Sequence, residues 1–139
     1  MKLTEHFTLS EFVRSEKATN RHIDNTPTPE IIENLRALCR NVIEPARVAF
    51  GAPIYITSGY RCPELNKAVG GKPTSQHLRG EAADLQVRGV ENLRMLYNVI
   101  KSSGVFDQML YESNGATKWI HVSYKSSGNR RQAIDNYNV

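Results

Sequence analysis

The chain has only two cysteines, Cys39 and Cys62, and this scarcity excludes several classes of protein. They lie 23 residues apart and form no CxxC motif. A disulfide framework, a cysteine-rich zinc site and a dithiol redox centre are therefore not indicated. We expect two free thiols, and a single disulfide between them is the open alternative.

Long apolar runs and clustered basic residues are also missing. No apolar run reaches the ~18–20 residues of a membrane helix, so we expect no membrane insertion. The first residues, Met-Lys-Leu-Thr-Glu-His-Phe-Thr, lack the apolar stretch and cleavage site of a signal peptide, which predicts synthesis in the cytoplasm. The net charge is +4, but Arg130-Arg131 is the only adjacent basic pair and no binding motif accompanies it, so we expect no nucleic-acid partner.

The sequence has the composition of an ordinary globular protein. Its 139 residues, 40% of them hydrophobic and 23% charged, predict one domain spanning residues 1–139. Thr8 and Glu11 have the spacing of a helix capping box, and Phe7 and Phe12 that of a hydrophobic staple, so we expect a helix over 7–15. Residues 16–28 are polar and rich in turn formers, which predicts a loop.

Two longer helices follow from apolar spacing. Thr28-Pro29 is typical of a helix start, and the pattern that follows ends near Gly51 with a kink expected at Pro45. A second helix is predicted over about 90–102, with these residues facing inward: Val90, Leu93, Leu96, Tyr97 and Ile100.

Four short runs resemble strands: 53–57, 82–87, 106–112 and 118–124. The last two flank residues 113–117, where Asn114-Gly115 predicts a hairpin turn. Helices followed by clustered strands predict an α+β fold with a small, mainly antiparallel sheet and helices packed on one side. We place the core at about 7–124 and interpret 125–139 as a C-terminal tail.

Three side chains suggest a metal centre: His77, Asp84 and His121. Small residues at Gly80 and Ala82 predict that the chain turns sharply between His77 on a loop and Asp84 on a strand. Alternation in 119–123 places His121 on the face opposite Ile120 and Val122, which we expect in the core. A lone histidine in a strand is usually only hydrogen-bonded, but two imidazoles and a carboxylate, with a fourth position left for water, are typical of catalytic zinc.

The motifs that carry these residues resemble the zinc D-Ala-D-Ala carboxypeptidase family. The resemblance comprises Ser75-x-His77-x-x-Gly80-x-Ala82-x-Asp84, Trp119-x-His121, and Ser58-Gly59-Tyr60-Arg61 with Asn66 and Gly70-Gly71, and it extends over about residues 7–124. It implies the core shared with the hedgehog signalling domain, and one Zn²⁺ per chain bound by His77, Asp84 and His121. It looks closest to the compact single-domain bacterial and phage branch, which implies action on peptidoglycan peptides.

Other residues receive roles beside this centre. Arg61 follows an apolar strand and is expected to bind a substrate carboxylate or a developing oxyanion, as the resemblance also implies; a salt bridge is its alternative. Ser75 is expected to bind a ligand or the loop backbone, and Trp119 and Gln108 to line the substrate groove. Asn66 and the Gly70-Gly71 pair are expected to shape a loop.

The general base is the open question. Many relatives carry a carboxylate three residues before the last histidine, whereas this chain has Lys118. Glu112 is our candidate if the hairpin loop has four residues, since it then lies opposite Trp119 and diagonal to His121. A tighter turn would instead place Gln108 opposite His121. Glu81 and Asp107 are weaker candidates.

These observations predict a monomeric zinc metallopeptidase that hydrolyses peptidoglycan stem peptides or cross-links. Either a carboxypeptidase or an endopeptidase fits, and a phage-type lysis enzyme released to the cell wall is the expected biology. The alternatives are a non-catalytic, zinc-stabilised wall-binding module and a phage structural module.

Overall fold

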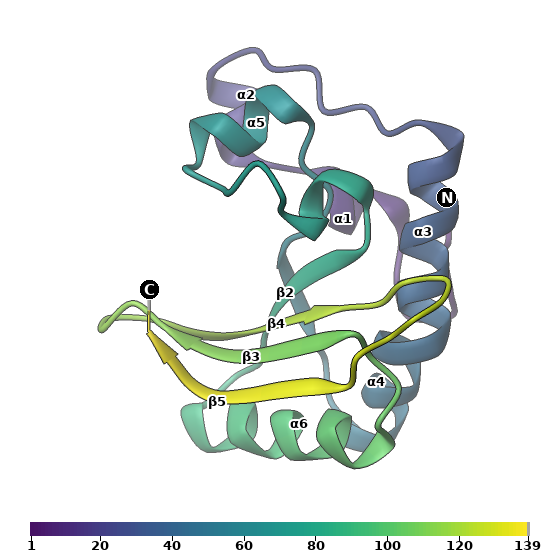
Figure 1. Ribbon diagram of the computed structural model, residues 1–139, viewed down its shortest axis with the longest axis vertical. Coiled ribbons are helices and arrows are strands. Elements are labelled where there is room, and N and C mark those ends of the chain that lie inside the picture. The colour runs from purple at the N-terminus through teal and green to yellow at the C-terminus, as the bar shows by residue number, and fades with distance from the viewer. Residues whose placement is uncertain (139) are drawn as a thin grey trace.

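The computed structural model describes residues 1–138, and a five-stranded sheet lies at its centre (Figure 1). The strand order is β1-β2-β4-β3-β5, with three antiparallel pairings and one parallel pairing between β3 and β5. The strands are β1 (Tyr55–Ser58), β2 (Ala82–Gln86), β3 (Gln108–Ser113), β4 (Lys118–Ser123) and β5 (Gln132–Asn138). The predicted α+β fold with a mainly antiparallel sheet is confirmed, and four of its strands lie where we expected them.

The fifth strand was not predicted, because it lies in the segment interpreted as a tail. Its sequence, Gln-Ala-Ile-Asp-Asn-Tyr-Asn, has too few apolar residues for a clear alternating pattern. It forms because β3 offers a free edge, with Gln108 paired to Gln132 and Leu110 to Ile134. Tertiary pairing therefore decides its structure rather than local propensity.

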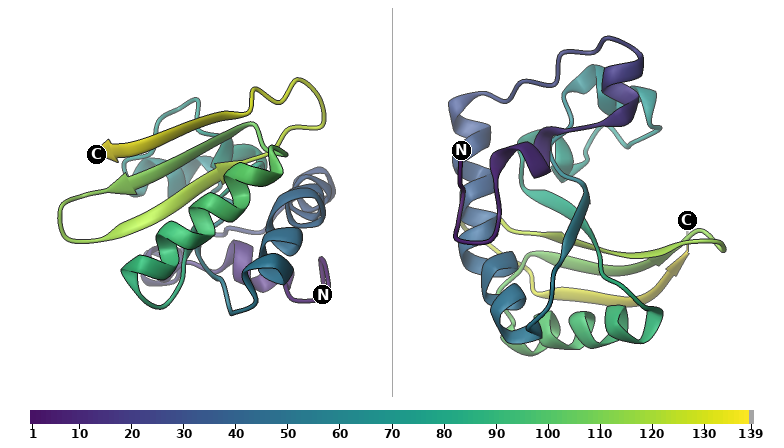
Figure 2. Two further views of the ribbon diagram at one scale, coloured as in Figure 1. Left: turned by 90° about the horizontal axis from the view of Figure 1, so that it is seen from below. Right: turned by 180° about the vertical axis from the view of Figure 1, so that it is seen from behind.

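Helix α6 (Val90–Ser103) runs along one face of the sheet (Figure 2). Four of its predicted inward residues are buried: Leu93, Leu96, Tyr97 and Ile100. The fifth prediction was wrong, because Val90 is 61% exposed. Val90 lies in the first turn, and Leu93 is the first residue of this helix that reaches the main hydrophobic core.

The predicted helix over 29–51 consists of three segments: α3 (Pro29–Leu38), a π-helical segment (Cys39–Ile43) and α4 (Glu44–Phe50). The irregularity expected at Pro45 takes the form of the π segment just before it. A proline ring clashes with the carbonyl four residues earlier, and widening the turn removes that clash. The helix ends at Gly51, whose φ of 79° suits glycine.

The remaining helices form a lobe over the other face of the sheet (Figure 1). Helix α1 (Leu9–Val13) begins as predicted, since Glu11 accepts a hydrogen bond from the backbone N–H of Thr8 at 2.9 Å. Helices α2 (Glu16–Asn20) and α5 (Pro63–Ala68) were not predicted. Five or six residues are too few for a helical period to be visible in the sequence.

Two further expectations concern the chain as a whole. Cys39 and Cys62 are both free, as expected, and Cys62 caps the start of α5. Within residues 1–138, no helix combines the length and apolar character needed to cross a membrane.

Candidate metal centre and cleft

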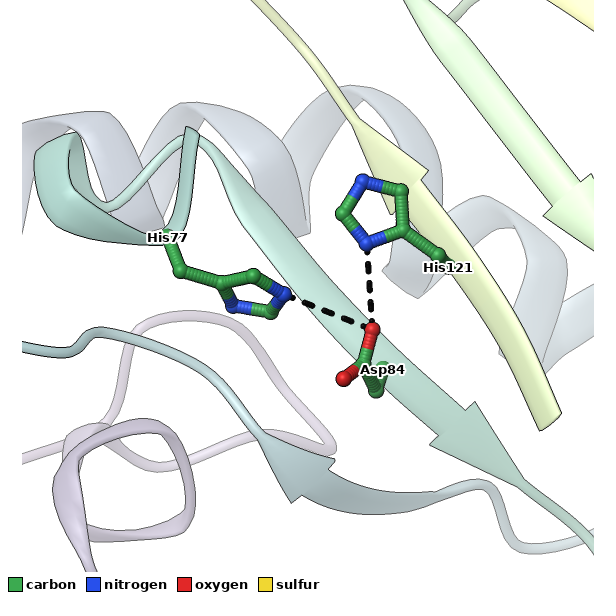
Figure 3. A group of neighbouring side chains, drawn as sticks. All are labelled: His77, Asp84 and His121. Carbon is green, nitrogen blue, oxygen red and sulfur yellow. Dashed lines mark hydrogen bonds and ion pairs between the residues drawn. The ribbon is translucent and has the colours of Figure 1, made fainter. Parts of the chain in front are cut away.

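Three elements bring the predicted metal ligands together (Figure 3). His77 lies in a 3-10 turn, η2 (Gln76–Arg79), Asp84 in the middle of β2, and His121 in β4 directly opposite Asp84. Asp84 Oδ1 is 3.4 Å from His77 Nε2 and 3.1 Å from His121 Nδ1. One ligand atom from each residue lies within 4.8 Å of the others, so the group can hold a single cation.

The ring nitrogen of His77 that faces away from Asp84 holds the imidazole in its orientation. This nitrogen, Nδ1, donates a hydrogen bond to the carbonyl oxygen of Gly59 at 2.6 Å, which directs Nε2 toward Asp84. Gly59 must be glycine here, since a Cβ would lie 2.4 Å from the backbone oxygen of Phe12. Ser75 caps the same turn by accepting a hydrogen bond from the backbone N–H of His77 at 3.2 Å.

The turn after His77 is as tight as the small residues predicted. Gly80 has a φ of 70°, and a Cβ there would approach Ile31 to within 2.9 Å. Ala82 is fully buried at the start of β2. This close packing against α3 directs the chain from His77 into the strand that carries Asp84.

The spacing and chemistry of the three ligands fit zinc. Ligands bonded to a tetrahedral zinc at ~2.0–2.1 Å lie ~3.3 Å from one another, close to the two Asp84 distances. Burial opposes ionisation of Asp84, but the charges and hydrogen bonds of His77 and His121 outweigh it, so its pKa falls well below the ordinary value. The carboxylate is therefore ionised, as a metal ligand must be.

The three ligands line a cleft of about 460 Å³ on the face of the sheet opposite α6. One wall is the loop between α5 and η2, including Gly70, Gly71 and Lys72. The sheet supplies the other wall with side chains from β3, β4 and β5. The site is thus open to a ligand along a groove rather than sealed, as a peptide-sized substrate requires.

Arg61 extends into this cleft and is held by three groups. Its Nε donates to Ser58 Oγ at 3.1 Å, one terminal nitrogen donates to Asn66 Oδ1 at 3.2 Å, and the other lies 3.7 Å from Asp84 Oδ2. The salt bridge that we considered as an alternative is therefore present, and its partner is Asp84, one of the three predicted metal ligands. The guanidinium is fixed beside the centre and still lines the cleft.

Asn66 and the glycine pair shape this wall, as expected. Asn66 is 4% exposed, and its amide donates to the carbonyl oxygen of Lys72 at 2.9 Å. A Cβ on Gly71 would lie 2.1 Å from Asn66 Oδ1 and 2.9 Å from Arg61, so only glycine fits. The loop therefore depends on the same contact that positions Arg61.

The hairpin has the wider of the two predicted loops. Glu112 pairs with Trp119, Leu110 pairs with His121, and Asn114 closes the loop by donating to the Thr117 carbonyl. The alternative with Gln108 opposite His121 is wrong. Burial raises the pKa of Glu112, the nearby Asp84 charge raises it further, and the two histidines and the Trp119 side chain oppose both.

The comparisons with known proteins agree with this geometry. The chain matches the family model described as Peptidase M15 over residues 5–123. It belongs to the peptidase M15 family. This is the zinc D-Ala-D-Ala carboxypeptidase-like family that the motifs indicated, and it makes the chain a peptidase. None of the curated proteins in the comparison matches the chain.

The other carboxylates considered as bases lie elsewhere in this M15 domain. Glu81 pairs with Arg79 at 2.8 Å and is not among the residues that line the cleft. Asp107 is fully buried and bound by Arg130 and Gln76. Lys118 is exposed and lines a separate hollow beside Val90. Of the three predicted bases, only Glu112 lines the cleft.

The other predicted substrate-contacting residues all reach the cleft. Ser75, Gln108 and Trp119 line it, and the Gln108 side chain donates to Gln132 Oε1 at 2.8 Å. Sequence patterns did not indicate several other residues that line the cleft, among them Lys72 and Tyr137. Tyr137 lies in the strand that was not predicted, so its position could not be foreseen.

Proposed function

We propose that this M15 peptidase is a zinc-dependent hydrolase of peptide bonds in peptidoglycan stem peptides or cross-links. The observation that carries the proposal is the convergence of His77, Asp84 and His121 on one point of an open cleft. Two imidazoles and one carboxylate at zinc-compatible distances leave part of the coordination sphere for water and substrate. A zinc ion bound there supplies Lewis acidity, which polarises a scissile carbonyl and lowers the pKa of water.

Glu112 is the residue that we propose as general base and acid. Its backbone lies diagonal to His121 across the hairpin, a spacing that a glutamate side chain spans, and it lines the same cleft. In this role its carboxylate accepts the proton of the attacking water and then delivers it to the leaving amine nitrogen. The carboxylate thus ends the cycle ionised, as it began.

Arg61 is the residue that we propose for charge recognition. Its guanidinium is fixed by Ser58 and Asn66, so it is preorganised for an anionic group. It would stabilise the oxyanion that develops at the attacked carbonyl, or bind the terminal carboxylate of a stem peptide. Binding of a terminal carboxylate corresponds to a carboxypeptidase. Stabilisation of the oxyanion serves a carboxypeptidase and an endopeptidase alike.

The substrate class of the proposal comes from the resemblance to D-Ala-D-Ala carboxypeptidases. We therefore propose that the protein acts at the cell wall, with release by a phage-type lysis system as one route to it. In this proposal it acts there as a monomer, since the group of three ligands needs no residue from a second chain.

Incubation of the zinc-loaded protein with purified sacculi tests the proposal. We expect zinc-dependent release of free D-Ala, if it is a carboxypeptidase, or of new amino groups, if it is an endopeptidase. Glu112→Gln should lower the rate by about 10²–10⁴-fold while zinc content and fold are retained. Glu81→Gln is the matched control, since Glu81 lies outside the cleft, and should retain full activity.

Two results would overturn the proposal. Absence of any zinc-dependent product from sacculi of all wall chemotypes would exclude peptidoglycan hydrolysis. Equal wall binding by the wild type and Glu112→Gln, with turnover in neither, would favour the non-catalytic wall-binding module instead.

A further inference from the structure

The C-terminal strand β5 contributes directly to the cleft, although it lies outside the family match. That match ends at residue 123, whereas β5 comprises Gln132–Asn138. Tyr137 in β5 lines the same cleft as the metal ligands and is only partly exposed. Its Cα partner in β3 is Glu112, so the two residues are neighbours across the strand pair.

A bulge in β5 brings Tyr137 to this position. Leu110 pairs with Ile134 and Glu112 pairs with Tyr137, so one residue of β3 is opposed by two residues of β5. The second of these, Asn136, has a φ of 60°, a left-handed conformation that asparagine tolerates better than most residues. Because side chains alternate along a strand, the extra residue places Tyr137 instead of Asn136 beside Glu112.

The strand is held on both sides of its centre. Asp135, the first residue of the bulge, forms an ion pair at 2.8 Å with Arg94 of α6, whose guanidinium lies 4.0 Å from the centroid of the Tyr111 ring. Before the strand begins, Arg130 binds the fully buried Asp107 through its backbone N–H and its guanidinium. These contacts fix β5 so that Tyr137 has a defined place in the wall.

The two walls of the cleft differ in chemistry. Arg61 and Lys72 lie on the side of the α5–η2 loop and carry positive charge. On the sheet side, three residues that surround Glu112 supply apolar and aromatic surface: Leu110, Trp119 and Tyr137. A cationic wall suits an anionic group of the substrate, whereas the aromatic wall suits an aliphatic side chain.

We propose that Tyr137, with Trp119, forms a subsite for the aliphatic side chain of a substrate residue next to the scissile bond. The proposal rests on the proposed peptide hydrolysis, which requires the peptide to lie between Glu112 and the metal ligands. A Tyr ring loses little conformational freedom on binding, so it provides contact area at low entropic cost. Tyr137 is thus a specificity-determining residue supplied by the C-terminal strand.

Binding in the catalytically impaired background tests this proposal. The zinc-loaded Glu112→Gln protein is titrated with a stem pentapeptide ending in D-Ala-D-Ala, and with two analogues in which glycine replaces one D-Ala. Adding Tyr137→Ala should raise the Kd of the D-Ala peptide about tenfold and reduce the preference for D-Ala over glycine at one position. Tyr137→Phe keeps the ring and should restore both values.

Asn138→Ala is the matched control, because Asn138 is exposed in the same strand and does not line the cleft. Zinc content and thermal midpoint are measured for every variant, so loss of β5 is distinguished from loss of the ring. An unchanged Kd and an unchanged preference in Tyr137→Ala would overturn the subsite. The proposed hydrolysis is tested separately. If the wild type cleaves no peptide and no sacculus, hydrolysis is refuted, whereas peptide binding that depends on the Tyr137 ring still supports the subsite.

Discussion

Two aspartates of this chain have opposite surroundings: Asp84 lies in β2 with its side chain 14% exposed, whereas Asp107 lies just before β3. Asp107 is fully buried and saturated, because it accepts hydrogen bonds from Gln76 and from both the backbone and the guanidinium of Arg130. Asp84 is bordered by two imidazoles at 3.1 and 3.4 Å and by a guanidinium at 3.7 Å. The pKa of both carboxyls is lowered, so a perturbed pKa does not distinguish them.

The two carboxylates differ in whether they can still reach an ion in the cleft. Asp107 is fully buried, its donors are Gln76 and Arg130, and it does not line the cleft. Asp84 instead lines the cleft, and the neighbouring His77 directs its Nε2 to the same point. A metal centre is therefore recognised by ligand atoms that converge on one point of an open cleft. A lowered pKa alone is equally typical of a carboxylate such as Asp107, which a buried ion pair holds in place.

Replacing the Asp84 carboxylate should change the protein most. Loss of a residue that only hydrogen-bonds a metal ligand lowers metal affinity roughly 10–100-fold. Asp84→Asn should lower zinc affinity by more than this, because it removes a charged ligand. Isothermal titration with zinc and metal analysis of the purified protein measure this. Asp107→Asn is the control and should retain wild-type stoichiometry, and an Asp84→Asn protein that binds zinc like the wild type would contradict the comparison.

Two single substitutions distinguish the contributions of Asp107 and Arg130, the two partners of the ion pair at Asp107, to stability. Arg130→Ala leaves the Asp107 carboxylate buried with fewer donors and should lower the free energy of unfolding by about 3–5 kcal/mol. Asp107→Asn removes the charge itself and leaves the half-exposed Arg130 solvated, so the loss should be smaller, about 1.5–3 kcal/mol.

Urea unfolding of both variants measures the difference. Lys101→Ala, at an exposed position of α6, is the control and should change stability by no more than about 0.5 kcal/mol. Equal stability of Arg130→Ala and the wild type would show that Asp107 is not an anchor.

The smallest effect is expected in acid. The hydrogen bonds from Arg130, opposed by burial, lower the pKa of Asp107 to about 2 from an ordinary value of 3.8. A lowered native pKa adds stability that is complete above the unfolded value and is lost as the pH falls, here between about 4 and 2. The stability advantage of the wild type over Asp107→Asn should therefore shrink by about 2 kcal/mol across this range. Unfolding midpoints at pH 5, 4, 3 and 2 measure it, and a constant difference would contradict the assignment.

Local signals in the sequence predicted the parts of the fold with clear periodicity. The helices over α3–α4 and α6 and the strands β1 to β4 carry apolar residues at regular spacing, and Asn114-Gly115 marks the hairpin turn. Val90 was placed wrongly because periodicity gives the direction of a side chain but not where the core ends. Helices α2 and α5 were missed because each is shorter than two helical turns.

Local sequence patterns were enough to predict the composition of the centre: two imidazoles and one carboxylate, each preceded or followed by residues typical of a turn or an alternating strand. They also indicated a tight turn at Gly80 and a loop at Gly70-Gly71, but not the atoms that exclude a Cβ there, which belong to other segments such as Ile31 of α3. Tertiary structure alone decided the hairpin register that puts Glu112 in the cleft, the partner of Arg61 and the strand that carries Tyr137. Each of these depends on contacts between residues far apart in the chain, and such contacts leave no periodic trace in either partner.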